Sequence, residues 1–186
     1  MNLSKEHFDM YNEYTLNINK IKREVNAIIK RQRFTARRCK RASEEEILDI
    51  EINKYEEVES INKKKIPSKI YEFSNGDIYI GKIVNGKMDG IGTYNFVEGI
   101  EYIGEFKNDM KNGLGMCTFK SGNIYIGNFL EDTINGMGQM VYKSKDEYMG
   151  NWLDGKKHGK GIYIWRDNSM YIGEFKNNKM DGYGVC

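Results

Sequence analysis

The stretch EYIGEFKNDMKNGLGMCTF, residues 101–119, decides the fold because its pattern returns at a constant interval along the chain. A tyrosine is followed two residues later by glycine and four residues later by Phe106. Paired glycines, Gly113 and Gly115, follow in the second half of the stretch. The tyrosine recurs every 23 residues, at Tyr79, Tyr102, Tyr125, Tyr148 and Tyr171. A fixed period of this length indicates a repeat array.

Each unit of the repeat predicts one β-hairpin. Side chains alternate between the faces of a strand, so Tyr102, Gly104 and Phe106 share one face. Pairs such as Asn85-Gly86 favour a tight hairpin turn because they accept positive φ. A second turn, at Glu98-Gly99 and its equivalents, joins consecutive hairpins in antiparallel order. We predict about eleven strands in a ribbon on the order of 50 Å long, from the usual spacing of strands.

The mixture of glycine and aromatic residues predicts how the ribbon is packed. A glycine leaves room for a ring to lie flat across the backbone, which is the arrangement called aromatic rescue. We therefore interpret the recurring aromatic side chains as the core of the array. The stripe consists of Tyr79, Tyr102, Phe106, Phe119, Tyr125, Phe129, Tyr148, Trp152, Trp165, Tyr171 and Phe175. A half unit, residues 71–78, precedes the first complete copy.

The recurring motif resembles the MORN repeat (membrane occupation and recognition nexus). The resemblance covers residues 71–186, and YMGNWLDGKKHGKGIYIWRDN, beginning at Tyr148, is similar to the family pattern throughout. The first unit departs from it at Ile83, where an aromatic residue is usual, and the third at Thr133-Ile134-Asn135. The resemblance implies an elongated, twisted antiparallel sheet of stacked hairpins and no single activity. Similar repeats occur at membrane contacts, in ciliary and cytoskeletal assemblies and beside catalytic domains, and phospholipid binding has been attributed to them.

Residues 1–66 form a separate, charged part of the chain, and the only proline, Pro67, marks its boundary with the array at 67–186. A helix is predicted over residues 7–32 by an apolar stripe with heptad-like spacing, typical of a coiled coil or of groove docking. Two interpretations are equally compatible with the stripe: it packs on the sheet of the same chain, or it binds a partner. Its residues are Tyr11, Tyr14, Ile18, Ile21, Val25 and Ile28.

A basic patch follows the stripe, within the segment 20–41. It contains Lys30, Arg31, Arg33, Arg37, Arg38, Lys40 and Arg41. Ser43-Glu44-Glu45-Glu46 then predicts the start of a second, acidic helix over about 44–62. The basic segment is compatible with pairing to that acidic helix, with binding to anionic lipid or an acidic partner, and with a calmodulin-like target helix. Charge alone would also suit nucleic acid, but no nucleic-acid-binding motif accompanies it, which disfavours that partner.

Composition suggests where the protein works. The net charge is only +2, but residues 1–70 carry sixteen Lys and Arg against twelve Asp and Glu. The three cysteines, Cys39, Cys117 and Cys186, lie far apart, which favours free thiols in a reducing compartment. We expect an intracellular, cytoplasmic protein associated with the cytoskeleton or a cilium, with a peripheral membrane location as the alternative.

The sequence carries no pattern of catalytic residues. Only two histidines are present, His7 and His158, and the second falls in a predicted turn. Gly159-Lys160-Gly161 lacks the spacing of a phosphate-binding loop, and no Cys/His cluster has metal-ligand spacing. We therefore expect a protein that is not an enzyme and that uses no cofactor or metal.

Three functions remain as hypotheses. The first is a scaffold or adaptor in a cytoskeletal or ciliary (axonemal) assembly, which binds protein partners through the ribbon and the N-terminal helix. The second is a membrane-associated adaptor that binds anionic phospholipid through the basic segment 20–41. The third is a regulatory subunit of a separate enzyme. We also expect a homodimer through the C-terminal edge, because the last strand leaves backbone donors and acceptors unpaired.

Overall fold

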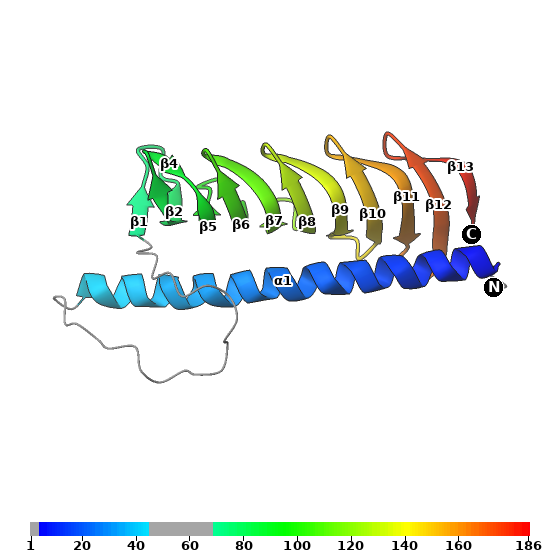
Figure 1. Ribbon diagram of the computed structural model, residues 1–186, viewed down its shortest axis with the longest axis horizontal. Helices are drawn as coiled ribbons and strands as arrows, with labels where there is room; N and C mark the ends of the chain where they lie inside the picture. Colours follow the sequence, from blue (N-terminus) through cyan, green and yellow to red (C-terminus); the bar gives the residue numbers. More distant parts are fainter. Residues whose placement is uncertain (1–3, 45–68) are drawn as a thin grey trace.

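The computed structural model describes residues 4–44 and 69–186, with side chains in the helix as far as Gln32. It consists of one long helix and one long antiparallel sheet (Figure 1). The elements are α1 (Lys5–Glu44), β1 (Lys69–Glu72), β2 (Ile78–Gly81), β3 (Ile83–Val84), β4 (Lys87–Met88), β5 (Gly90–Asn95), β6 (Glu101–Lys107), β7 (Met110–Thr118), β8 (Ile124–Leu130), β9 (Thr133–Val141), β10 (Glu147–Leu153), β11 (Lys156–Ile164), β12 (Met170–Lys176) and β13 (Lys179–Val185).

The sheet has eleven strands in sequence order, from β1 to β13, and β3 and β4 form a separate two-stranded piece. This confirms the predicted fold class, which is mainly β with an α-helical N-terminal extension and stacked hairpins. Register is constant: Gly104 pairs with Gly115 inside one hairpin, and Gly115 pairs with Gly127 of the next. In the later hairpins the register shifts after the first glycine, and in the first hairpin the strands are interrupted at the corresponding place.

The two predicted classes of turn are both present, with different geometry. Inside the hairpins both central residues have positive φ, as at Asn108 (52°) and Asp109 (72°). This is the requirement of the type I′ turn, and it explains the preference for Asn, Asp and Gly. Between hairpins only the last turn residue has positive φ, as at Gly99 (88°), whose N–H donates to the Phe96 carbonyl.

Helix α1 extends beyond the apolar stripe of residues 7–32. It continues through the basic segment to Glu44. Residues 33–44 contain no glycine or proline, and Arg, Lys and Ala are good helix formers, so nothing in this stretch stops the helix. The predicted acidic helix over 44–62 lies outside the described residues, apart from Glu44 itself.

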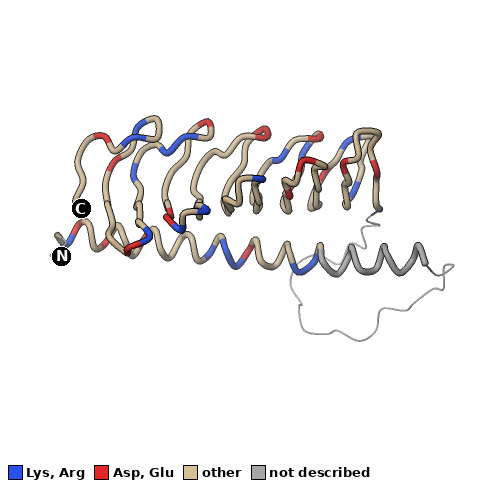
Figure 2. Tube along the Cα trace, turned by 180° about the vertical axis from the view of Figure 1, so that it is seen from behind, with Lys and Arg blue, Asp and Glu red and all other residues tan. Residues whose placement is uncertain are grey.

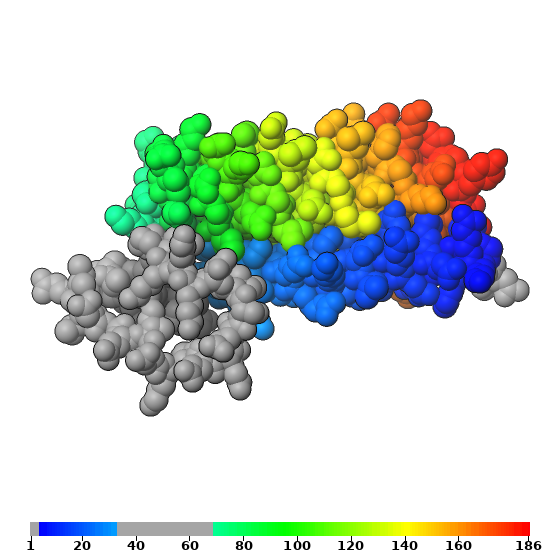
Figure 3. All heavy atoms as spheres, in the orientation of Figure 1, coloured from blue at the N-terminus to red at the C-terminus, as the bar shows by residue number. Residues whose placement is uncertain are grey.

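Helix α1 lies across the strands and packs on one face of the sheet (Figures 1 and 3). Near its N-terminus, Tyr14 and Ile18 are buried against Met149, Ile162 and Ile172. Further along, Val25, Ile28 and Ile29 are buried against Ile103. The helix therefore runs opposite to the order of the repeats, with its N-terminus beside the last hairpins.

The lengths of the two elements explain how one helix fits the whole array. Two strands of a sheet advance by about 9.6 Å, and seven helical residues advance by about 10.5 Å. One heptad of α1 therefore spans nearly one hairpin. Ile18 and Val25, seven residues apart, are accordingly buried among side chains of different repeats.

Candidate protein-binding surface

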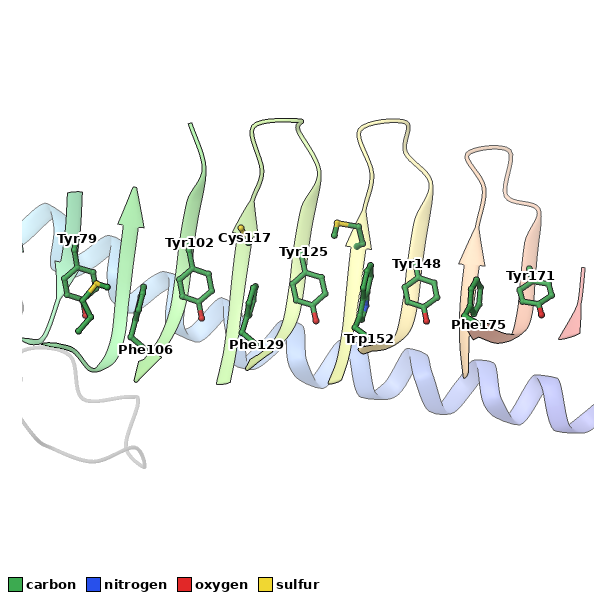
Figure 4. Close-up of a cluster of buried hydrophobic side chains, with 12 residues drawn as sticks. Tyr79, Tyr102, Phe106, Cys117, Tyr125, Phe129, Tyr148, Trp152, Tyr171 and Phe175 are labelled. Carbon is green, nitrogen blue, oxygen red and sulfur yellow. The ribbon is translucent and has the colours of Figure 1, made fainter. Parts of the chain in front are cut away.

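The face of the sheet opposite α1 carries a continuous row of aromatic rings (Figure 4). Tyr102, Tyr125, Tyr148 and Tyr171 each contact the Phe or Trp four residues later on the same strand edge to face, as Tyr102 does Phe106 at 5.1 Å between ring centroids. Tyr79, Tyr102, Tyr125 and Tyr148 also contact the corresponding ring of the next hairpin, as Tyr102 does Phe129 at 5.0 Å. Edge-to-face pairs of this kind add to the stability gained by burying the rings.

The glycines make room for these rings, as the sequence predicted. A Cβ on Gly150 would lie 2.5 Å from the Tyr148 hydroxyl oxygen, and a Cβ on Gly161, which pairs with Gly150, would also lie 2.5 Å from it. Each tyrosine thus lies over the glycine two residues later and over that glycine's partner. Each hydroxyl donates to the carbonyl three residues later, and Tyr148 does so to Asn151 at 2.9 Å. The row is therefore a core and not an open binding site.

Burial also keeps these phenols neutral. It is the main cause that raises the pKa of Tyr102, Tyr125 and Tyr148 well above its ordinary value. Burial likewise raises the pKa of the Cys117 thiol to about 11, so this cysteine is a poor nucleophile near neutral pH. Neither group has the reactivity that chemistry at this face would need.

A second set of rings on the same face is only partly buried, and we call it the aromatic face. It packs against the tyrosine row and lies toward the turns between hairpins. Two members of the predicted stripe, Phe119 and Trp165, belong to this set and not to the buried row. The rings of the aromatic face are Tyr71, Tyr94, Phe119, Tyr142, Tyr163 and Trp165, together with Phe73 and Phe96, which contact the ring of Tyr94.

Two lysines stand among these rings at the same position of units two repeats apart. Lys111 Nζ lies 5.7 Å from the Phe96 centroid and forms an ion pair with Asp132 at 3.6 Å. Lys157 Nζ lies 4.6 Å from the Tyr163 centroid and within 5.9 Å of Tyr142, Tyr148 and Phe175 as well. Burial lowers the pKa of Lys157 from its ordinary value, and the nearby Asp146 carboxylate opposes that shift.

Side chains of the turns tie each repeat to the next. Asp109 accepts from the backbone N–H of Met88 at 2.7 Å, and Asp132 accepts from that of Lys111 at 2.9 Å. At the other turns, Asp77 accepts from Val97 N–H, and Asp146 accepts from Arg166 N–H. These hydrogen bonds keep the pKa of Asp77 below its usual value, and with those from Ser144 they do the same for Asp146. These hydrogen bonds join consecutive hairpins into one continuous array, so the partly exposed rings lie at regular intervals along it.

The predicted helix stripe meets the sheet of its own chain. Tyr14, Ile18, Val25 and Ile28 are buried there, and Tyr11 and Ile21 are half-buried. The Tyr14 hydroxyl also accepts from Asn151 Nδ2 at 3.0 Å. Of the two interpretations of the stripe, the structure therefore shows the intramolecular one, and its assignment as a partner-binding face is corrected.

The basic patch is only partly described. Lys30 and Arg31 are exposed on α1, together with Arg23 and Lys20, which lie about two and three turns earlier. The side chains of Arg33, Arg37, Arg38, Lys40 and Arg41 lie outside the described residues. Along the array, basic and acidic residues are interspersed (Figure 2).

The described residues offer no ligand set for a metal: no group of three or more His, Cys, Asp or Glu side chains converges among them. His158 is half-buried in the fourth hairpin, and its Nδ1 has no partner among the described atoms. Within the described residues, no helical segment is both long enough and apolar enough to cross a bilayer.

Comparison with known proteins agrees with this architecture. None of the curated proteins compared with the chain matches it. The family model of the MORN repeat matches five consecutive segments, 79–100, 102–124, 125–147, 148–170 and 171–186. Each match begins at or next to a repeat tyrosine, and together they cover more than half of the chain. The chain belongs to the MORN-repeat family.

Proposed function

We propose that this protein is a non-catalytic scaffold or adaptor that holds protein partners on the aromatic face of its repeat array. One observation carries the proposal: α1 covers one face of the sheet, while partly exposed rings and two lysines stand on the other. Among residues 5–32 of α1, whose side chains the structure describes, none belongs to the cluster on that second face. Aromatic side chains are enriched where proteins bind one another, and MORN repeats are known to bind proteins and membrane lipids.

The finer part of the proposal is a place in a cytoskeletal or ciliary assembly. An eleven-stranded ribbon braced along its length by a helix presents a long, rigid row of contacts. Such a shape suits a partner that is itself extended, because contacts at fixed spacings then add up along it.

Proximity labelling in cells tests both parts. The full chain would be fused to a biotin ligase and compared with the double variant Phe119→Ser and Trp165→Ser. We expect the wild type to label cytoskeletal or axonemal proteins and the double variant to lose most of them. Leu16→Ser is the matched control, because Leu16 is 65% exposed on the outer side of α1. Unchanged neighbours in the double variant, with its circular dichroism intact, would refute the proposal.

A membrane-associated adaptor is the second candidate, supported by the exposed Lys20, Arg23, Lys30 and Arg31 of α1. Basic residues on a helix attract anionic headgroups, and this attraction weakens with salt. The test is sedimentation of the full chain with vesicles of phosphatidylcholine and phosphatidylserine. Salt-sensitive binding that is lost when these four residues become Gln would establish it, and absence of binding at low salt would remove it.

A further inference from the structure

The two lysines of the aromatic face, Lys111 and Lys157, differ in the charge of the turn residue beside them. Lys111 and Lys157 are equivalent positions, 46 residues apart. The turn residue that accepts from the backbone N–H of Lys111 is Asp132, and its equivalent at Lys157 is Asn178. Both accept at 2.9 Å, so the backbone tie is kept in each case. Only the negative charge is missing from the second.

The consequence is an ammonium group without a carboxylate partner. Asp132 neutralises Lys111 at 3.6 Å, whereas no carboxylate among residues 4–32 and 69–186 lies within 4.0 Å of Lys157 Nζ. The carboxylate that acts on the pKa of Lys157 is that of Asp146, which raises it. Its oxygens already accept from Ser144, Tyr163 and the backbone of Arg166. They hold the turn together and leave Lys157 in contact with rings alone.

We propose that Lys157 and the rings around it bind a carboxylate side chain of an acidic, aromatic-containing segment of a protein partner. The ammonium would form the ion pair with the incoming carboxylate, as Lys111 does with Asp132. Tyr142, Tyr163 and Trp165 would pack against the apolar or aromatic residue beside it. This inference rests on the proposed function, and it names the chemistry of the partner.

The energetic argument favours a peptide over a simple anion. Cationic side chains near aromatic rings are partly desolvated, so a charge-assisted contact there is stronger than one in open water. A free anion would gain only that contact, whereas a peptide also buries apolar surface on three partly exposed rings. A membrane surface would instead favour many separate basic residues, whereas basic and acidic residues are interspersed along the array (Figure 2).

The repeat supplies matched variants. Position 157 is occupied by Met88, Ile134 and Met180 in other units, so Lys157→Met fits the array. Position 178 is occupied by Asp109 and Asp132 elsewhere, both with positive φ and the same backbone tie, so Asn178→Asp fits as well. Lys111→Met is the control, because Lys111 already has its carboxylate.

The experiment is isothermal titration calorimetry of the full chain with a random copolymer of glutamate and tyrosine. We expect Lys157→Met and Asn178→Asp each to weaken binding at least about tenfold, which is the worth of one charge-assisted hydrogen bond. We expect Lys111→Met to change it less than about twofold. Polyglutamate without tyrosine, inorganic phosphate and anionic vesicles are the comparison ligands, and each should bind more weakly than the copolymer.

Several results would overturn the inference: no binding by the wild type, equal losses in Lys111→Met and Lys157→Met, or tighter binding of phosphate or vesicles than of the copolymer. A further result would separate the two proposals. If the wild type binds the copolymer, the double variant Phe119→Ser and Trp165→Ser does not, and Lys157→Met binds as tightly as the wild type, the proposed function stands and this inference fails. If the labelled partners of the full chain do not depend on the aromatic face at all, the proposed function fails with it.

Discussion

The ring of Tyr148 occupies the space that a side chain on Gly161 would need. A Cβ built on Gly161 would lie 2.5 Å from the tyrosine hydroxyl oxygen, well inside contact distance. The backbone of Gly161 does not have positive φ, so the constraint on this residue is steric and not conformational. The same relationship recurs at each repeat tyrosine, whose ring lies over one glycine on its own strand and one glycine on the neighbouring strand.

Gly161→Ala therefore tests the packing directly. We expect a loss of about 1–3 kcal/mol in the free energy of unfolding, because the added methyl overpacks a rigid core. Urea unfolding followed by circular dichroism measures it. In a Tyr148→Leu background the same substitution should cost clearly less, since the ring that it meets is gone. Additive losses in the double variant would contradict this account.

The contact between α1 and the sheet predicts a second effect. Ile18 is buried against Met149, Ile162 and Ile172, so Ile18→Ala should cost about 2–5 kcal/mol if helix and sheet unfold together. Hydrogen exchange along α1 should then accelerate. Leu16→Ala, on the outer side of the helix, should leave both readings unchanged. Equal exchange in the two variants would show that the helix is not held by this contact.

Alkaline pH should destabilise the protein through its partly buried phenols. Burial raises the pKa of Tyr94 and of Tyr142 to about 12, while an unfolded tyrosine titrates near 10. The unfolded state then loses protons first, so the contribution of these groups is complete below about pH 10 and falls as pH rises toward 12. Urea midpoints between pH 9 and 11.5 should decline accordingly. A constant midpoint over this range would argue against burial of the rings.

The turn ties give an acid-side prediction. Asp146 accepts hydrogen bonds that lower its pKa, so its contribution is present above the unfolded pKa of about 4 and is lost as pH falls below it. Asp146→Ala should lower the urea midpoint at pH 7. Asp146→Asn should lower it much less, because Asn123 makes the equivalent tie to Lys143 N–H in the preceding unit. Equal midpoints for the Ala and Asn variants would mean that the tie contributes nothing.

The C-terminal edge carries the last prediction. Strand β13 is an edge of the sheet, and Tyr183 on it is 90% exposed. We propose that two copies pair through this edge, and light scattering at micromolar concentration should then give a dimer. Tyr183→Lys should give a monomer, because a lysine on an edge strand disfavours pairing. A monomeric wild type would dispose of the idea.

The repeat explains why so much of the array could be predicted. Five copies in register fix strand direction, turn class and the tyrosine row, because every copy repeats the same local requirement. The destination of the helix stripe could not be chosen in the same way, since a heptad-like stripe has the same appearance whether it packs on its own sheet or on a partner.

Polar residues were the other gap. Asp109 and Asp132 in turns suggest only solubility, yet they accept backbone hydrogen bonds from the preceding hairpin. Their spacing of 23 residues was the available signal. The difference between Asp132 and Asn178 was also present in the sequence, but its meaning depends on knowing that each lies beside a lysine.

The near match between seven helical residues and one hairpin makes α1 a ruler for the array. A further hairpin would need about one more heptad of apolar helix surface to be covered in the same way, and deletion of the heptad from Ile18 to Glu24 would leave apolar side chains of the sheet uncovered. Duplication of a 23-residue unit would thus require a matching extension of the N-terminal helix, a segment that does not itself contain the repeat.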